Sequence, residues 1–298
     1  MQNVLTINGG SSSIRFAMHE VSARMKPTLQ GKLDHLGLPS MTLSLNDAPP
    51  TAVDSKRPAS AFLLDWLTAR GAFEKLAAVG HRIVHGMHHT EPVLVTDALL
   101  SELRTITGCD PEHLPLEIEL IETIRQRYPA LPQVTCFDTA FHRTMPRVAK
   151  MLPIPRRYEA QGIQRYGFHG LSYAYLLEEL HRLDPAAAQG RVILAHLGSG
   201  ASVAAVLDGQ CIDTSMGFTP AGGVMMSTRS GDVDPGLLSY LTQTEALNAS
   251  QLQQMLTHES GLLGVSATSA DMRQLLATEA TDERAAEAVA MFCYQIKK

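Results

Sequence analysis

The sequence predicts an α/β fold built from two similar halves, and three observations support this prediction. Short alternating apolar runs, typical of strands, are mixed along the chain with longer segments in which apolar residues recur at helical spacing. The chain begins with two strand-like runs, 3–7 and 14–21, which are joined by the small-residue turn NGGSSS. A second strand, small-residue turn and alternating strand aligns Leu194 with Leu5, which indicates a duplicated fold.

The first half is expected to alternate strands and helices. The stretch 28–55 is rich in turn residues and is expected to hold short strands. The segment ASAFLLDWLTARG predicts a helix that Gly71 ends, and AAVGHRIVHG predicts a strand. The segment DPEHLPLEIELIETIRQRY predicts a helix that begins after Pro115, and QVTCFDTAFH predicts a strand that runs into a loop.

The prolines Pro146, Pro153 and Pro155 indicate a domain boundary. The length of 298 residues is sufficient for two domains, which we expect over 1–150 and 151–298. The elements expected in the second domain are a helix around 171–183, a strand at RVILAHLGSG, helices at 234–256 and 269–277, and a last helix in DERAAEAVAMFCYQIKK.

The composition excludes several classes of protein. The formal net charge is −5, so neither a general nucleic-acid partner nor a membrane surface is expected. The first residues lack the pattern of a secretory signal, and no apolar run approaches the ~20 residues that span a bilayer. The four cysteines are far apart and form no C-x-x-C pair, which favours reduced thiols in a cytoplasmic protein.

The two small-residue turns are candidate phosphate sites. Small residues leave successive backbone N–H groups uncovered, and serine hydroxyls and a nearby arginine add further donors for an anion. Neither turn matches G-x-x-x-x-G-K-[ST] or a G-x-G-x-x-G that leads into a helix. Each turn alone could be a simple tight hairpin, but a pair of them, each after a strand, favours a nucleotide site.

Four histidines lie close together in the sequence: His81, His85, His88 and His89. His81 and His85 would share one face of a strand, but no H-E-x-x-H pattern or cysteine partner follows. We therefore expect structural or solvent-facing histidines here rather than a zinc site.

A series of motifs resembles, in order, those of acetate kinases and of the related propionate and butyrate kinases. They are NGGSSSIR, GHRIVHG, FDTAFH, YGFHGLS, HLGSGAS, DTSMGFTP, MMSTRSGDVDP and SADMR. The resemblance covers essentially the whole chain. It implies a duplicated two-domain fold like that of actin and the sugar kinases, with ATP in the cleft between the domains.

The resemblance also implies the reaction, in which the γ-phosphoryl group of ATP passes to acetate, giving acetyl phosphate and ADP, with Mg²⁺ as a cofactor. A carboxylate acceptor is already ionised at pH 7 and needs no general base. It needs relief of repulsion between two anions and stabilisation of the phosphoryl group in transfer. By resemblance the catalytic residues are Arg82, Asp138, His169 and Arg229, and Asp138 is expected to orient an arginine or a metal-bound water.

The resemblance implies further binding residues. The carboxylate substrate is expected to contact Arg82, Val84, Phe168, Pro220 and His113. ATP is expected to contact Ser11, Ser13 and Arg15 in the first turn, His196, Leu197, Gly198, Ser199 and Gly200 in the second, and Asp271, Met272 and Arg273 in SADMR. Asn8 is expected near Mg²⁺. From its composition, SADMR is also expected to hold a helix N-cap at Ser269, with Asp271 in the first turn.

Several alternatives stay open at this point. Glu112 occupies a position that is usually apolar in the family, so propionate, butyrate or a more polar acid could replace acetate. A sugar kinase or actin-like ATPase is disfavoured by the motifs.

Family members continue past the last helix into a glycine-rich segment that helps to hold ATP and Mg²⁺. The chain could therefore be a catalytically weak fragment that only folds and dimerises, with weak ATP binding. A homodimer is expected for the family.

Overall fold

The computed structural model describes residues 2–10, 12–22, 26–46 and 48–298. The chain forms two compact units, Met1–Ala140 and Phe141–Lys298. The expected division into duplicated domains at residue 150 stays a prediction. Within the described ranges, no helix is both long enough and apolar enough to cross a bilayer.

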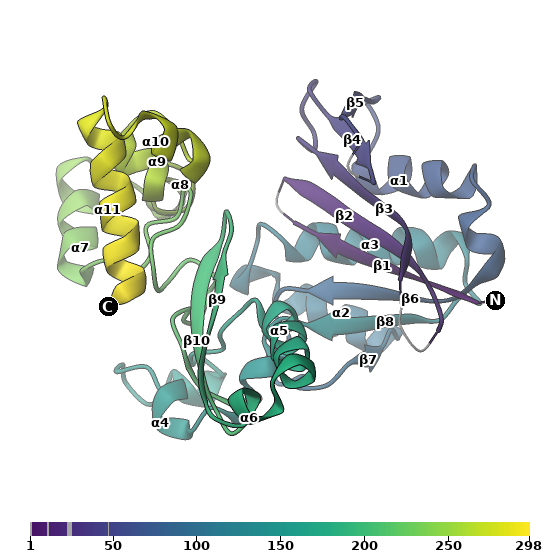
Figure 1. Ribbon diagram of the computed structural model, residues 1–298, viewed down its shortest axis with the longest axis horizontal. Helices are drawn as coiled ribbons and strands as arrows, with labels where there is room; N and C mark the ends of the chain where they lie inside the picture. The colour runs from purple at the N-terminus through teal and green to yellow at the C-terminus, as the bar shows by residue number, and fades with distance from the viewer. Residues whose placement is uncertain (1, 11, 23–25, 47) are drawn as a thin grey trace. The chain divides into compact units, whose positions relative to one another are not determined.

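The first unit contains an eight-stranded mixed sheet (Figure 1). Its strands are β1 (Asn3–Gly9), β2 (Ser13–Glu20), β3 (Pro27–Asp34), β4 (Thr42–Leu45), β5 (Thr51–Ala52), β6 (Leu76–Ile83), β7 (Val93–Leu94) and β8 (Gln133–Phe137). Their order across the sheet is β5-β4-β3-β2-β1-β6-β8-β7. The strands β1, β6 and β8 are parallel neighbours, and β1 and β2 form the predicted antiparallel hairpin.

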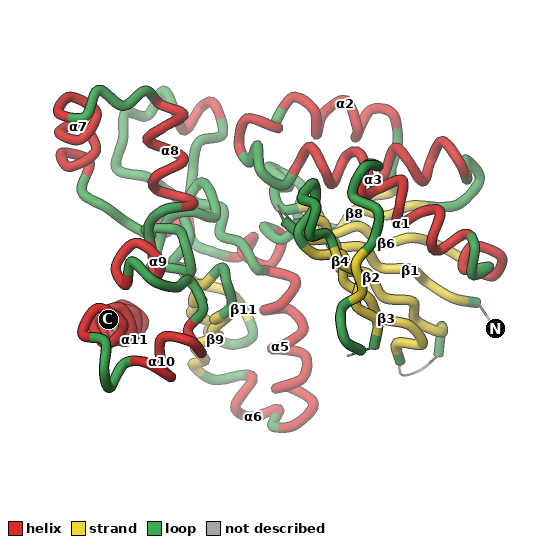
Figure 2. The backbone as a smooth tube through the Cα atoms, turned by 90° about the horizontal axis from the view of Figure 1, so that it is seen from above, coloured by secondary structure: helices red, strands yellow, loops and turns green. Residues whose placement is uncertain are grey.

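Three helices cover one face of this sheet (Figure 2). They are α1 (Ala59–Thr68), α2 (Asp97–Thr105) and α3 (Leu114–Arg127). The core is built from the alternate inward residues of the first hairpin and the apolar faces of α1 and α3, with Leu5, Phe16, Leu63, Leu67 and Leu120 all buried. Helix α2 was not predicted from the sequence; it is short and is capped by the Thr96 side chain, which accepts the Leu99 N–H at 3.1 Å.

The second unit contains a three-stranded antiparallel sheet in the order β11-β10-β9. Its strands are β9 (Arg191–Leu197), β10 (Ala201–Leu207) and β11 (Gln210–Thr214). The hairpin of β9 and β10 confirms the predicted second strand–turn–strand unit. The helix α5 (Gly170–Leu183) packs on this sheet, where Tyr173 shares a buried cluster with Leu194, Ala204 and Val206.

The remaining helices of the second unit differ in part from the predictions. They are α4 (Arg147–Lys150), α6 (Pro185–Ala188), α7 (Pro235–Thr244), α8 (Ala249–His258), α9 (Gly261–Ser266), α10 (Met272–Thr278) and α11 (Glu283–Lys297). The predicted helix 234–256 is wrong as a single element, because a capping box between Asn248 and Gln251 starts a separate helix. Leu262, Leu275, Ala285 and Ala288 form the core that joins α9, α10 and α11.

Candidate functional site

The carboxyl ends of three parallel strands bring together polar residues of the first unit. The sheet register places Asn8 of β1 beside Arg82 of β6. Asp138 directly follows β8, and its backbone N–H donates to the carbonyl of Ile83 at 3.0 Å. The carboxyl ends of neighbouring parallel strands are a common location for ligand sites in α/β folds.

Arg82 is held between two carboxylates. Its Nε and Nη2 donate to Asp138 Oδ2 at 3.0 and 2.6 Å. Its Nη1 donates to Glu117 Oε1 at 2.8 Å and to the carbonyl of Gly9 at 3.2 Å. These bonds occupy four of the five guanidinium N–H groups, so the side chain has a fixed orientation. The structure therefore brings together Arg82 and Asp138, two of the residues predicted from the motifs.

Glu117 is a member of this group that the sequence analysis did not identify. Its side chain is only 1% exposed, and its two oxygens also accept the N–H of Val84 at 3.2 and 3.0 Å. The available signal was its position on α3, where it shares the apolar face with Leu114, Ile118 and Ile121. A carboxylate on an apolar helix face requires a buried partner, and Arg82 is that partner.

Burial and neighbouring charges shift the ionisation of both side chains. Burial raises the pKa of Glu117 to about 8, against the opposing effect of Arg82 and the Val84 N–H, and the nearby Asp138 and Asp110 contribute to the rise. Burial alone would lower the pKa of Arg82. The negative charges of Asp138 and Glu117 outweigh the effect of burial, so the pKa of Arg82 is raised. Arg82 therefore stays charged, which is the form that can bind an anionic substrate.

His113, predicted as a substrate residue, is paired with Asp110. His113 Nδ1 lies 2.8 Å from Asp110 Oδ1 and 3.0 Å from Oδ2, and the backbone N–H groups of Glu112 and His113 both donate to Oδ1 at 3.2 Å. Both residues of this contact are buried near the start of α3. Asp110 thus fixes the His113 imidazole through Nδ1, and Nε2 of His113 is not used in this contact.

The first small-residue turn joins β1 and β2. The Gly10 N–H donates to the carbonyl of Ser13 at 2.8 Å, which closes a tight turn after Asn8. Arg15 lies on β2 with an exposed side chain. Ser11, also predicted to contact ATP, lies outside the described residues. The arrangement leaves polar groups at the end of the hairpin, and their contact with nucleotide stays a prediction.

In the second unit His169 lies in a network of polar side chains. It has a left-handed backbone (φ 60°) just before α5, and its Nδ1 is 2.8 Å from Ser202 Oγ. The same Ser202 hydroxyl contacts the hydroxyl of Tyr173, which is fully buried. The ring of His196 stacks on that of His169 at 4.0 Å, and its Nδ1 is 3.0 Å from Ser172 Oγ. These contacts hold the His169 ring through Nδ1.

The second small-residue turn lies against His169 and Arg229. A Cβ atom on Gly200 would be 3.1 Å from His169 Nε2 and 3.7 Å from Arg229 Nη1, so the absence of a side chain permits this approach. Arg229 Nη1 also donates to the carbonyl of Pro220 at 3.3 Å, and the Gly198 N–H donates to that of Gly200 at 3.0 Å. The structure therefore brings His169, Arg229 and Pro220 together around this turn.

The other predicted residues occupy varied environments. Val84 and Phe168 are each 1% exposed, and the carbonyl of Phe168 accepts a hydrogen bond from His142 Nε2 at 3.0 Å. Leu197 is 51% exposed at the end of β9. The carbonyl of Ser199 accepts the N–H of Ser227 at 3.1 Å, which ties the second turn to the loop before Arg229.

The SADMR segment corrects one prediction. The N-cap of α10 is Asp271 rather than Ser269, and the Asp271 carboxylate accepts the Arg273 N–H at 2.8 Å. Ser269 lies two residues earlier, where its hydroxyl accepts the Asp271 N–H at 3.0 Å and thereby closes a turn before the helix. The Arg273 guanidinium pairs with Asp271 at 2.6 Å and lowers the pKa of that carboxyl to about 2. Met272 is the first helical residue.

Two of the clustered histidines are buried within the first unit. His81 Nε2 is 2.7 Å from Gln133 Oε1, and burial lowers its pKa to about 4. His85 Nδ1 accepts the N–H of Met87 at 3.1 Å. Both are buried and hydrogen-bonded, whereas the sequence left structural and solvent-facing positions open for these histidines.

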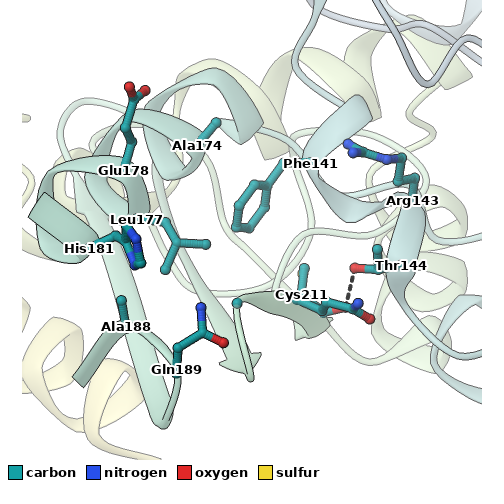
Figure 3. A pocket seen from close by; sticks show the side chains of 12 residues that line it. Phe141, Arg143, Thr144, Ala174, Leu177, Glu178, His181, Ala188, Gln189 and Cys211 are labelled. Carbon is teal, nitrogen blue, oxygen red and sulfur yellow. Dashed lines mark hydrogen bonds between the residues drawn. The ribbon is translucent and has the colours of Figure 1, made fainter. Parts of the chain in front are cut away.

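The second unit also has an open pocket of about 540 Å³ beside α5 (Figure 3). Its lining is Phe141, Arg143, Thr144, Ala174, Leu177, Glu178, His181, Ala188, Gln189, Gly209, Gln210 and Cys211. None of the residues predicted from the motifs lines it. Burial raises the pKa of the Cys211 thiol to about 12, which makes a reactive thiolate unfavourable there.

Comparison with known proteins identifies acetate and propionate kinases as similar to this chain. The sequence profile of the Acetokinase family matches residues 3–298. An acetate kinase from Rhodopseudomonas palustris is 41% identical over 99% of this chain and 77% of its own length. A propionate kinase from Citrobacter rodentium is 40% identical over 99% of this chain and 76% of its own length.

Solved structures agree with the sequence comparison. The acetate kinase of Porphyromonas gingivalis superimposes with a TM-score of 0.87 at 33% identity, over 100% of this chain and 78% of that one. A propionate kinase of Francisella tularensis gives a TM-score of 0.92 at 33% identity, over 99% of this chain and 78% of that one. The predicted α/β fold class is thereby confirmed.

Proposed function

Because this chain belongs to the acetokinase family, we propose that it is a carboxylate kinase that transfers the γ-phosphoryl group of ATP to acetate. The products are acetyl phosphate and ADP, and the reaction is reversible. The family match over residues 3–298 is the observation that carries the proposal. The alternative of a weak fragment that only folds and dimerises is not favoured, because the similar proteins are named acetate kinase or propionate kinase.

The contacts of Arg82 support this chemistry. Acetate is ionised at neutral pH, so the enzyme must offset repulsion between two anions rather than remove a proton. Asp138 uses one oxygen to bind both Nε and Nη2 of Arg82. Its role in the proposal is therefore to orient the arginine, and Arg82 supplies the positive charge for the carboxylate or the phosphoryl group.

His169 and Arg229 are proposed to stabilise the phosphoryl group during transfer. Ser202 contacts His169 at Nδ1 and orients the ring, and Nε2 is the nitrogen proposed to contact an oxygen of the phosphoryl group. Arg229 lies at the same turn, where Gly200 allows both side chains to approach closely. Phosphoryl transfer depends almost wholly on positioning and charge stabilisation, and these residues supply both.

Nucleotide binding is proposed at the two small-residue turns, through Ser11, Ser13 and Arg15 in the first turn and His196, Leu197, Gly198, Ser199 and Gly200 in the second. Asp271, Met272 and Arg273 are proposed on the adenosine side. Mg²⁺ bound with ATP would neutralise phosphate charge, and the amide oxygen of Asn8, at the exposed end of β1, is a donor that suits this ion.

Propionate is the second candidate substrate, since propionate kinases are among the similar proteins. Val84, Phe168 and Pro220 are proposed to line the acyl pocket, with His113 nearby. One methylene changes discrimination in an apolar pocket by only about 1–3 kcal/mol, so both acids should react with a preference for one. Trapping of the acyl phosphate with hydroxylamine over a series of acids tests this. Reaction only with a dicarboxylic or polar acid would contradict the proposed pocket.

The decisive test of the reaction is removal of the two arginines. Arg82→Ala and Arg229→Ala should each lower turnover on the order of 10³-fold, the scale of an arginine that stabilises a transferring phosphoryl group. Arg104→Ala, which removes a surface arginine paired with Glu122, is the matched control. Near-normal acetyl phosphate formation in both variants would exclude these arginines from the mechanism.

We also propose that the enzyme acts as a homodimer in the cytoplasm, as the family resemblance implies. Light scattering coupled to gel filtration gives the mass of the particle, and a mass of one chain at micromolar concentration would contradict the dimer. Cell fractionation tests the location.

A further inference from the structure

Three metal-ligating side chains gather in the first unit outside the Arg82 group. The Nε2 atoms of His88 and His89 lie 3.4 and 3.1 Å from Oε1 of Glu102. One donor atom from each residue lies within 4.8 Å of the other two. We propose that His88, His89 and Glu102 form a binding site for a divalent transition-metal ion of the Zn²⁺ type.

The spacing of the donors matches the coordination of such an ion. Zn²⁺ binds histidine nitrogen and carboxylate oxygen at about 2.0–2.2 Å in a tetrahedral arrangement, which separates neighbouring ligand atoms by roughly 3.3 Å. The two separations between histidine nitrogen and Glu102 oxygen are 3.1 and 3.4 Å. An ion can therefore replace the present hydrogen-bonded contacts with small side-chain movements, and a fourth position stays open to water.

Packing holds two of the three ligands in place. The His89 ring stacks on Phe137 at 5.1 Å with an interplanar angle of 10°, and its side chain is 17% exposed. The His89 N–H donates to the carbonyl of Gly86 at 2.8 Å, which fixes the turn after β6. Glu102 lies on the helix α2. His88 is 74% exposed, so its side chain has room to adjust to a bound ion.

The donor chemistry selects the class of ion. Two imidazole nitrogens with one carboxylate favour Zn²⁺, Cu²⁺ or Ni²⁺, whereas Mg²⁺ and Ca²⁺ prefer oxygen ligands throughout. Among the described residues, the side chains that pair with Glu102 are these two histidines, so no lysine or arginine competes for its oxygens. The site is thus chemically distinct from the one that binds Mg²⁺ with ATP. It does not depend on the proposed kinase reaction.

The test is titration of the untagged full chain with Zn²⁺ in the presence of excess Mg²⁺, by calorimetry. We expect one strong Zn²⁺ site per chain, unaffected by Mg²⁺. His89→Ala and Glu102→Gln should each weaken binding at least about tenfold, since even indirect partners of metal ligands contribute that much. The control His258→Ala removes an exposed histidine of the second unit and should bind as the wild type does.

A spectroscopic readout completes the test. Co²⁺ in place of Zn²⁺ gives intense visible absorption only in a tetrahedral or similar site, and this absorption should be lost in His89→Ala and in His88→Ala. Circular dichroism establishes that each variant is folded. Binding of Zn²⁺ that persists unchanged in the three variants overturns the proposal, as does wild-type protein that binds no Zn²⁺. The latter result would identify the cluster as a set of contacts between the histidines and Glu102 that binds no metal.

Discussion

Replacing Glu117 by Gln tests the electrostatic description of the Arg82 group. The variant keeps the volume of the side chain and an oxygen that can accept from Arg82 and from the Val84 N–H. It removes only the buried negative charge. The kinase reaction is not needed for this test, because the charge affects folding itself.

The expected effect depends on pH, and its sign follows from the direction of the shift. Burial, against the effect of Arg82, raises the pKa of Glu117 from 4.5 to about 8 in the folded chain. The folded state therefore holds this proton more tightly than the unfolded state, and stability falls as pH rises from 4.5 through 8. The full loss is at most on the order of 5 kcal/mol. Gln does not titrate, so its free energy of unfolding does not carry this loss. The stability of the variant relative to the wild type should therefore rise by that amount between about pH 5 and pH 9.

Urea denaturation followed by tryptophan fluorescence measures this difference in the first unit, because the single tryptophan, Trp66, lies in α1. Comparing wild type with variant cancels groups that both contain, such as His81, whose lowered pKa of about 4 makes stability rise with pH between about 4 and 6.5. The matched control is Glu122→Gln, which replaces a partly exposed glutamate on the same helix and is measured over the same pH range. The reasoning would be refuted if the difference in free energy of unfolding between wild type and variant were constant from pH 5 to pH 9. That result would show that Glu117 is ionised throughout this range beside Arg82.

Two further predictions concern contacts within each unit. Tyr173→Phe leaves the buried Ser202 hydroxyl without one partner and loosens its hold on His169. Because misplacement of a positioned group slows the reaction, kcat should fall roughly tenfold. The unsatisfied hydroxyl should also cost about 1–3 kcal/mol of stability. An unchanged kcat in steady-state assays would contradict this. Gly31→Ala would place a Cβ 2.2 Å from Cζ of Phe16, which lies opposite on β2, and overpacking should cost about 1–3 kcal/mol. The urea midpoint should fall, and an unchanged midpoint would show that the ring moves aside easily.

The sequence by itself determined the elements whose burial pattern is local. Alternating apolar residues predicted the β1–β2 hairpin, and helical spacing predicted α5 and α11, since both patterns report which face of a segment is buried. The motifs also identified Arg82 and Asp138, which the structure joins at 2.6 Å. The short helix α2 was missed although Leu99, Leu100 and Leu103 recur at helical spacing and Thr96 supplies an N-cap.

Only the tertiary structure decided which distant residues meet. Glu117 contacts Arg82 because α3 packs on β1 and β6, and no sequence spacing encodes that approach. Glu102 reaches His89 because the turn after β6 returns beside α2. In neither pair are the two residues separated by the spacing that brings side chains together within one strand or one helix. The physical reason is that local patterns specify which side of an element is buried, whereas the partner on the other side is fixed only when the elements pack together.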